Sequence, residues 1–322
     1  MLWAKLLAYM ENTWTVTEED DGARLDIFLR DQSDGISRSA IAKLIKDGHA
    51  TVNGNAASVH RFLKIGDTVV FHISEPETKR KKSDAKSEAL PPLKIIKETA
   101  EWIVIDKPSG ILVHPDTKRK TGTLVDMLVA HDPAISRVGE DPSRPGIMHR
   151  LDKEVSGLMV IAKTQDAFDV LKRQFAEHSV EKTYLALCYG QVTQDEGDIK
   201  FRIARSKNKA RMAALPETER SGQVAWTHYK TVKRFQNASL LELEIYTGRT
   251  HQIRAHLLAL GHPIVGDSLY TSDRGKKKIE TPRLLLQAIR LSFIDPKTKQ
   301  PQTFTHSPDP AFDRVIKTLS PL

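Results

Sequence analysis

The chain of 322 residues has one cysteine, Cys188, and no long apolar run. A single cysteine excludes an internal disulfide framework and any zinc site built from several cysteines, and it suits a reducing compartment such as the cytoplasm. No apolar stretch approaches the roughly 20 residues that a membrane-spanning helix needs, so we expect no membrane segment. The sequence also has no internal repeat.

The first ten residues are apolar, but the stretch is short and contains no small-residue cleavage site. Acidic residues follow it at 18–21. These features disfavour a signal peptide. We therefore expect residues 1–21 to form an N-terminal extension or a short helix.

Charged residues are abundant, at 28% of the chain, beside 39% hydrophobic residues. That balance and the length predict a globular protein of about two domains. Lysine and arginine outnumber aspartate and glutamate by 49 to 41, which gives a formal net charge of +8. A positive excess favours polyanionic partners because neutralised phosphates release counterions, although many basic proteins bind no nucleic acid.

Residues 22–75 have the pattern of a small independent module. Apolar residues recur at helical spacing in 24–29 and 37–48, and Ser37 stands where an N-cap is expected. Asn53-Gly54 predicts a tight hairpin turn, and residues 68–73 have the composition of a strand. A charged stretch at 76–92 is typical of a linker, and residues 93–322 form the second predicted domain.

The helix expected at 37–48 carries Arg38, Lys43 and Lys46, which must point largely away from its buried stripe. This module resembles the RNA-binding module named after a small-subunit ribosomal protein, the S-four type or α-L motif. The resemblance implies that the three basic residues contact RNA. From the pattern alone, an ordinary module with a solvated basic face is an equal alternative. The basic run at 79–82 fits either a solubilising tether or an added phosphate contact.

Strand patterns dominate after residue 93. We expect strands at 102–105, 158–162, 182–190, 225–235, 239–246 and 284–293, and helices at 166–178 and 250–260. Many strands, few helices and no regular alternation between them predict an α+β domain. Its centre is a large, mainly antiparallel mixed sheet with flanking helices.

Four motifs follow one another in this second domain. They are KPSGILVHP at 107–115, HRLD with SGL at 149–158, KTYLA at 182–186, and TGRTHQIRAH at 247–256, which runs on to LGHPIVGD at 260–267. Together they strongly resemble the large-subunit ribosomal RNA pseudouridine synthases of the RluA type, over roughly residues 95–310. The resemblance implies the pseudouridine synthase fold. It also implies isomerisation of uridine in RNA, in which the base leaves C1′ through N1, rotates and rejoins through C5.

The resemblance also implies roles for individual residues. Asp152 matches the catalytic carboxylate, Arg254 the cation that pairs with it, and Tyr184 the aromatic residue that stacks on the detached base. Arg150 and Arg249 are the expected RNA contacts of this domain. The reaction needs no redox step or group donor, so neither metal nor organic cofactor is implied.

Each assignment has a plainer alternative. By pattern alone Asp152 is a turn former, Arg254 a surface cation and Tyr184 a core aromatic residue. Arg150 could make a plain phosphate contact or a local ion pair with Glu154. Two other function classes stay open: a catalytically silent RNA-binding or ribosome-assembly factor, and a hydrolase of small glycosides. The hydrolase needs a second carboxylate about 5–10 Å from the first.

Several neighbouring residues carry weaker predictions. Val155 and Gln287 stand where the family usually has Thr and His, which puts loop packing and one hydrogen bond in doubt. Leu286 fits either an apolar wall behind the uracil or an ordinary core position. Four histidines are expected to form a hydrogen-bonding scaffold instead of a metal site, because their spacing suits chelation poorly: His149, His251, His256 and His262.

The expected partner is structured RNA, most of all large-subunit ribosomal RNA, and a transfer RNA target stays open. We expect a monomer that acts in the cytoplasm without a membrane partner. The target uridine is not readable from the sequence.

Overall fold

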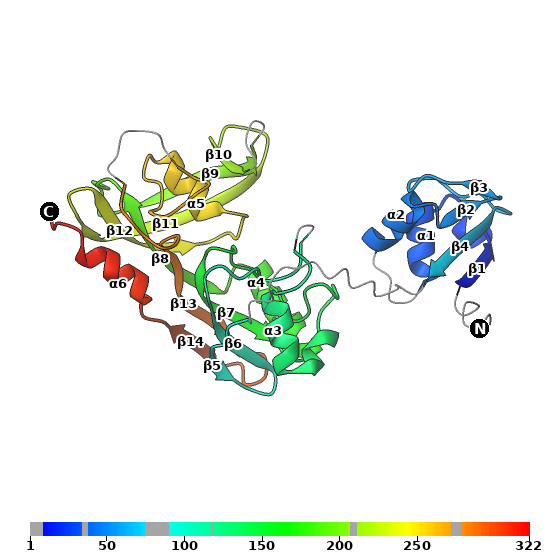
Figure 1. Ribbon diagram of the computed structural model, residues 1–322, viewed down its shortest axis with the longest axis horizontal. Helices are drawn as coiled ribbons and strands as arrows, with labels where there is room; N and C mark the ends of the chain where they lie inside the picture. Colours follow the sequence, from blue (N-terminus) through cyan, green and yellow to red (C-terminus); the bar gives the residue numbers. More distant parts are fainter. Residues whose placement is uncertain (1–8, 34–37, 75–89, 117–118, 207–210, 272–277) are drawn as a thin grey trace, which may run out of the picture. The chain divides into compact units, whose positions relative to one another are not determined.

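The computed structural model describes residues 9–33, 38–74, 90–116, 119–206, 211–271 and 278–322 (Figure 1). The chain divides into two compact units, Met1–Glu88 and Ala89–Leu322. Within the described ranges, no helix combines the length and the apolar character that crossing a membrane requires. The predicted linker at 76–92 falls almost wholly outside those ranges.

The first unit is an antiparallel sheet in the order β1-β4-β2-β3 with two helices packed on it. Its elements are β1 (Tyr9–Thr15), a 3-10 turn η1 (Glu18–Asp20), α1 (Leu25–Asp31), α2 (Arg38–Lys46), β2 (Ala50–Val52), β3 (Asn55–Ala56) and β4 (Thr68–Ser74). The apolar faces of both helices meet the sheet through Leu25, Leu29, Ile41 and Ile45, all buried. The helical spacing read from the sequence therefore does form the core of this unit.

The structure moves the start of this module towards the N-terminus. Strand β1 pairs with β4 along its whole length, from Tyr9 opposite Ser74 to Thr15 opposite Thr68. Residues 9–15, which we expected to lie in an extension or short helix, are a strand of the module's sheet. The sequence pattern did not identify this strand, because its partner lies more than fifty residues later in the chain. Residues 1–8 lie outside the described part of the chain.

The predicted hairpin turn is confirmed. Asn53 and Gly54 have φ angles of 55° and 75°, the left-handed values that a two-residue turn between β2 and β3 requires. The Asn53 side chain also accepts a hydrogen bond from the Thr68 N–H at 2.8 Å. One side chain thus joins the turn to the start of β4.

The second unit contains a ten-stranded sheet in the order β10-β9-β11-β12-β8-β13-β7-β6-β5, with β14 paired to β13. Every pairing is antiparallel except that of β13 with β7, which confirms a large, mainly antiparallel mixed sheet. The strands are β5 (Ile95–Glu98), β6 (Trp102–Lys107), β7 (Ser156–Ala162), β8 (Glu181–Tyr189), β9 (Glu196–Arg205), β10 (Met212–Leu215), β11 (Gln223–Arg234), β12 (Ala238–Ile245), β13 (Leu286–Ile294) and β14 (Pro301–Thr305).

The helices of this unit are α3 (Leu124–His131), a 3-10 turn η2 (Pro133–Arg137), α4 (Gln165–Ala176), α5 (Gln252–Ala259) and α6 (Pro310–Lys317). In Figure 1, α3 and α4 lie beside β6 and β7, and α5 lies by β9 and β11. The predicted helices at 166–178 and 250–260 correspond to α4 and α5. We did not predict α3, α6, β5, β9, β10 or β14. In β9, Ile199, Phe201 and Ile203 alternate with charged residues, a strand signal that we missed. In β14, exposed and partly buried residues alternate, so its apolar pattern is weak.

The central strand β8 separates two apolar clusters. Tyr184 and Ala186 pack into the largest core cluster, together with Leu286 of β13. Leu185 and Leu187 point to the other face, where α6 covers them through Phe312. The alternation of a strand therefore places Tyr184 on the face away from α6.

Gly157 allows β7 and β13 to approach each other closely. Its φ is 115°, and a Cβ atom there would lie 2.2 Å from the Ala288 carbonyl oxygen. These two residues are also register partners in the parallel pairing. A side chain at this position would push apart the strands that carry the candidate site.

We expect Gly157→Ala to lower the free energy of unfolding by about 3 kcal/mol or more, because it adds both backbone strain and a clash with backbone. Urea unfolding followed by circular dichroism measures the loss. Gly248→Ala is the matched control, since a Cβ atom there meets nothing within 4 Å. Equal stability of the two variants would contradict the packing argument.

Candidate active site

Asp152 lies in the loop that precedes β7. Its carbonyl accepts a hydrogen bond from the Val155 N–H at 3.1 Å, which closes a tight turn. The Ser109 hydroxyl donates to the Glu154 carbonyl at 2.7 Å, and the Gly110 N–H donates to the Lys153 carbonyl at 2.8 Å. The segment after β6 thus clamps the loop from one side and fixes the backbone that carries Asp152.

Lys107 lies beneath this loop with no exposed surface. Its Nζ donates to the carbonyls of Pro108 at 2.9 Å, Ile111 at 2.9 Å and Lys153 at 3.2 Å. Burial lowers the pKa of Lys107 to about 7, while the negative charge of Asp152 acts in the opposite direction. The sequence motif contained this lysine, but we assigned it no role.

Arg254 joins two carboxylates. Its Nη1 is 3.3 Å from Asp152 Oδ2, while its Nε and Nη2 donate to the two oxygens of Asp267 at 2.7 and 2.9 Å. The side chains of Arg254 and Asp267 are 6% and 0% exposed, and that of Asp152 is 18% exposed. The fork on Asp267 therefore fixes the guanidinium, and its remaining nitrogen faces the more accessible Asp152.

Asp267 is a site residue that sequence reasoning missed. Burial alone would raise its pKa, but hydrogen bonds from Arg254 and from the N–H groups of Leu269 and Tyr270 lower it. The preceding Gly266 has φ 82°, and a Cβ atom there would lie 2.1 Å from the Arg283 carbonyl. The Gly-Asp pair that ends the fourth motif was the available signal: the glycine permits the turn, and the aspartate holds the arginine.

His251 also lies beside Asp152. It is the N-cap residue of α5, with a left-handed φ of 55°, and its Nε2 is 3.8 Å from Asp152 Oδ2, the oxygen that Arg254 also approaches. Its Nδ1 is 3.0 Å from the hydroxyl of Tyr270, whose ring also faces the Arg254 guanidinium at 4.9 Å. Backbone strain at a residue that touches a carboxylate is typical of functional sites.

Asp152, Tyr184 and Arg254 line one narrow slot of about 70 Å³, so the structure brings together the three residues predicted to react. Val155, Ile245 and Leu286 provide apolar walls, and Asp152 is the one carboxylate among the lining residues. Burial, with the charge of Asp152, raises the pKa of Tyr184, so its phenol stays protonated at neutral pH. The slot offers one carboxylate beside a flat ring, and no pair of carboxylates such as a glycoside hydrolase uses.

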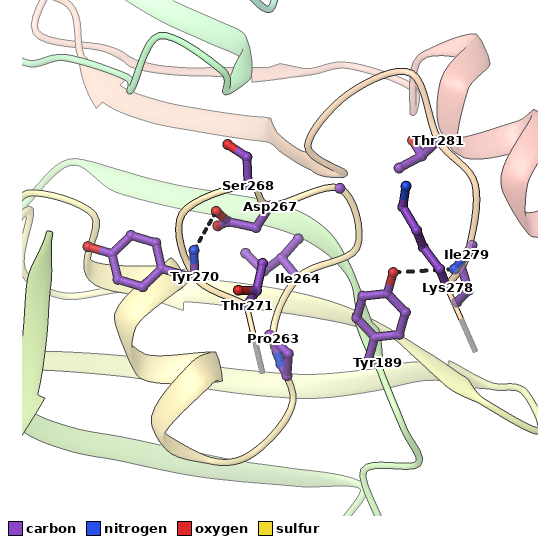
Figure 2. A pocket seen from close by; sticks show the side chains of 11 residues that line it. Tyr189, Pro263, Ile264, Asp267, Ser268, Tyr270, Thr271, Lys278, Ile279 and Thr281 are labelled. Carbon is purple, nitrogen blue, oxygen red and sulfur yellow. Dashed lines mark hydrogen bonds between the residues drawn. The ribbon is translucent and has the colours of Figure 1, made fainter. Parts of the chain in front are cut away.

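A separate cavity of about 460 Å³ is lined in part by residues 263–271 and 278–281 (Figure 2). Tyr189 accepts a hydrogen bond there from the Ile279 N–H at 3.3 Å, and Asp267 accepts one from the Tyr270 N–H at 2.9 Å. The charge of Asp267 is already engaged by Arg254. Among the residues that the structure describes, this cavity therefore presents no carboxylate other than the paired Asp267, and the candidate site is the slot beside Asp152.

Two of the predicted RNA-contacting arginines also line the slot. Arg150 is exposed and donates to His114 Nε2 at 3.0 Å, which differs from the ion pair with Glu154 that we considered. Arg249 donates from Nε to the Val224 carbonyl at 3.2 Å. Lys46 is exposed at the end of α2, whereas the side chains of Arg38 and Lys43 lie outside what the structure describes.

The histidines make the kind of contacts expected of a scaffold. His149 accepts from the Val160 N–H at 3.1 Å, and His262 Nδ1 is 2.9 Å from the Tyr189 carbonyl. His256 Nδ1 is 3.0 Å from the Thr227 hydroxyl. Gln287 is fully buried and bonds to the segment at 306–309, outside the slot. Among the residues that the structure describes, no group of three His, Cys, Asp or Glu side chains could hold a metal ion.

The chain is similar to known proteins in both of its units. A family model described as RNA pseudouridylate synthase matches residues 101–259, and an S4 domain model matches residues 23–69. An uncharacterised RNA pseudouridine synthase of Synechocystis is 38% identical, over 87% of this chain and 84% of that protein. Ribosomal large subunit pseudouridine synthase D of Nitrosomonas europaea is 37% identical, over 90% of this chain and 83% of that protein.

A solved human structure, RNA pseudouridylate synthase domain containing 1, gives a TM-score of 0.57 at 26% identity. The match covers 71% of this chain and 89% of that chain. The S4 domain match confirms the N-terminal module that the resemblance implied. The ten-stranded sheet and the structural match confirm the large sheet that the strand pattern predicted.

We expect Lys107→Met to lower the free energy of unfolding by about 3 kcal/mol at pH 9, because it removes a buried amine that, even when neutral, donates two hydrogen bonds to the surrounding carbonyls. The loss should be smaller at pH 7. Between the folded pKa of about 7 and the ordinary value of 10.5, the unfolded chain binds more protons than the folded protein. The stability of the wild type relative to the variant therefore rises with pH, by up to about 1.4 kcal/mol per unit.

Urea unfolding of both proteins at pH 7, 8 and 9 measures this difference. A difference that is constant across the three pH values would show that Lys107 does not titrate in this range.

Proposed function

This chain belongs to the RNA pseudouridine synthases, isomerases that convert uridine in RNA to its C-glycoside, and on that premise we propose its substrate and its reacting residues. The proposed substrate is large-subunit ribosomal RNA, and the proposed reacting residues are Asp152, Arg254 and Tyr184. The observation that carries the proposal is the 3.3 Å contact between Asp152 and Arg254 inside a slot that Tyr184 also lines.

Asp152 supplies the negative charge that the reaction needs. Breaking the bond between C1′ and N1 leaves an electron-poor centre, and a carboxylate beside it acts as a nucleophile or as a counter-ion. A largely buried carboxylate is costly unless it is paired, and the Arg254 guanidinium at 3.3 Å from Asp152 offsets that cost. Arg254 needs no movement to do so, because Asp267 holds its other two nitrogens.

Tyr184 keeps the detached base in place. Its side chain is 7% exposed and lies on the wall of the slot, where the ring can stack on a uracil that has left the RNA helix. Because burial raises its pKa, the phenol is an uncharged hydrogen-bond donor throughout the neutral range. Leu286, 3% exposed, contributes an apolar wall to the same slot.

The RNA outside the slot meets basic residues. Arg150 and Arg249 stand at the slot, and we propose that Arg38, Lys43 and Lys46 of the S4 module contact the RNA elsewhere. The net charge of +8 favours that partner. Large-subunit ribosomal RNA is proposed because several relatives, including the one from Nitrosomonas europaea, are named for that substrate. We propose that the enzyme acts as a monomer in the cytoplasm, where its single cysteine stays reduced.

Asp152→Asn should abolish catalysis. The amide is close in size but carries no negative charge, so we expect tritium release from RNA labelled at uridine C5 to fall by at least about 1,000-fold. The assay uses an unmodified large-subunit ribosomal RNA transcript. Release from the variant at the wild-type rate would remove Asp152 from the mechanism.

Asp267→Asn tests the support of the arginine. It leaves the buried Arg254 with Asp152 as its one charged partner, at 3.3 Å, so we expect about 3 kcal/mol less stability and a lower kcat at unchanged KM. Glu280→Gln is the control, because that exposed carboxylate has an ion pair with an equally exposed lysine, Lys278. If Asp267→Asn kept the kcat of the control, Asp267 would not be needed to orient Arg254.

A further inference from the structure

Another cavity, different from the one in Figure 2 although also of about 460 Å³, adjoins the slot. We call it the second cavity. The two share five lining residues: Arg150, Tyr184, Ile245, Gly248 and Arg249. They are therefore neighbouring parts of one cleft. An RNA chain that places a uridine in the slot must direct an adjacent nucleotide along the walls of the cleft.

The described lining of the second cavity contains cations and no anions. It includes Arg144, Arg150, Lys182 and Arg249, but no aspartate or glutamate. Arg144 has an ion pair with Asp141 at 3.2 Å, and the other two arginines donate to His114 and to a backbone carbonyl. This charge distribution suits a phosphate of the RNA backbone.

Lys182 is the cation in this cavity whose charge is not compensated. Within the described part of the chain, no ion pair or hydrogen bond engages its Nζ, which lies 5.3 Å from the centre of the Phe175 ring. Burial lowers the pKa of Lys182 to about 8. A half-buried ammonium without an anion is costly, and an entering phosphate would relieve that cost.

Strand β8 places Lys182 close to the slot. Lys182 and Tyr184 are alternate residues of β8, so their side chains project from the same face of the sheet. Tyr184 lines both the slot and the second cavity, whereas Lys182 lines the second cavity alone. The Lys182 ammonium thus belongs to the residue two positions before Tyr184, whose ring we propose covers the base.

We infer that the second cavity binds the nucleotide next to the target uridine, with the Lys182 ammonium contacting its backbone phosphate. This inference rests on the proposed function, since it assumes that the slot receives a uridine of the RNA. The nearby His149 ring, stacked on Phe175 at 4.4 Å, does not compete for the phosphate as a cation. Burial and the charge of Lys182 lower the pKa of His149 to about 3, so it stays neutral.

The test compares Lys182→Met, which keeps an unbranched side chain without charge, with Lys182→Arg, which keeps the charge. Lys317→Met is the control, because this exposed lysine is on α6, which packs on the opposite face of β8. The probe is the large-subunit ribosomal RNA transcript labelled at uridine C5. Its Kd is measured by filter binding between 50 and 300 mM KCl, and its conversion by tritium release under single-turnover conditions.

We expect Lys182→Met to bind the transcript roughly tenfold more weakly, as for one lost charged hydrogen bond. The slope of log Kd against log salt should fall by about 0.7 to 0.9, as for one lost phosphate contact. Lys182→Arg and Lys317→Met should bind as the wild type does. A melting temperature of Lys182→Met that is no lower than that of the wild type would show that the variant is folded.

The two proposals fail in different ways. If the wild type releases tritium and Asp152→Asn does not, the proposed function stands. Wild-type affinity and salt slope in Lys182→Met would then overturn the phosphate contact alone. A loss of kcat in Lys182→Met at unchanged Kd would also overturn it, because it would make Lys182 a support for Tyr184.

Discussion

The site depends on one guanidinium that is fixed before substrate arrives. Arg254 donates from two nitrogens to Asp267, whose side chain is 0% exposed, and its third nitrogen faces Asp152. A buried ion pair gives little net stability, since desolvation offsets most of its attraction. Here the pair with Asp267 fixes the orientation of the Arg254 guanidinium, so that its third nitrogen points at Asp152. The carboxylate that must stay negative therefore meets a cation whose position does not depend on the ligand.

The loop that carries Asp152 is held by hydrogen bonds to its backbone carbonyls. Lys107 and Ser109, both from the segment that ends β6, bind carbonyls of the loop at 153–154. Gly157 then lets β7 lie close to β13, the strand that brings Leu286 into the slot. The loop is thus clamped at its base and aligned by the sheet. This explains why a segment that looks like an ordinary turn can hold a reacting group.

The sheet also organises the cleft. Strand β8 carries Lys182 and Tyr184 on one face, while Leu185 and Leu187 pack on the other face beneath α6. A single strand therefore links the core, the ring proposed to stack on the uracil and the ammonium proposed to contact the RNA backbone. If both proposals hold, one rigid element positions the target base and the neighbouring nucleotide.

The sequence by itself determined the α+β class and the Asn53-Gly54 hairpin, which follow from local periodicity and turn chemistry. Its resemblance to a known family pointed to Asp152, Tyr184 and Arg254. All of these signals depend on neighbours in the chain. Only the tertiary structure decided that β1 joins a sheet through β4, that Asp267 holds Arg254, and that Lys107 supports the loop. Each of those depends on which distant segments pack together. Periodicity records whether a residue is buried, but it does not record its partner across the fold.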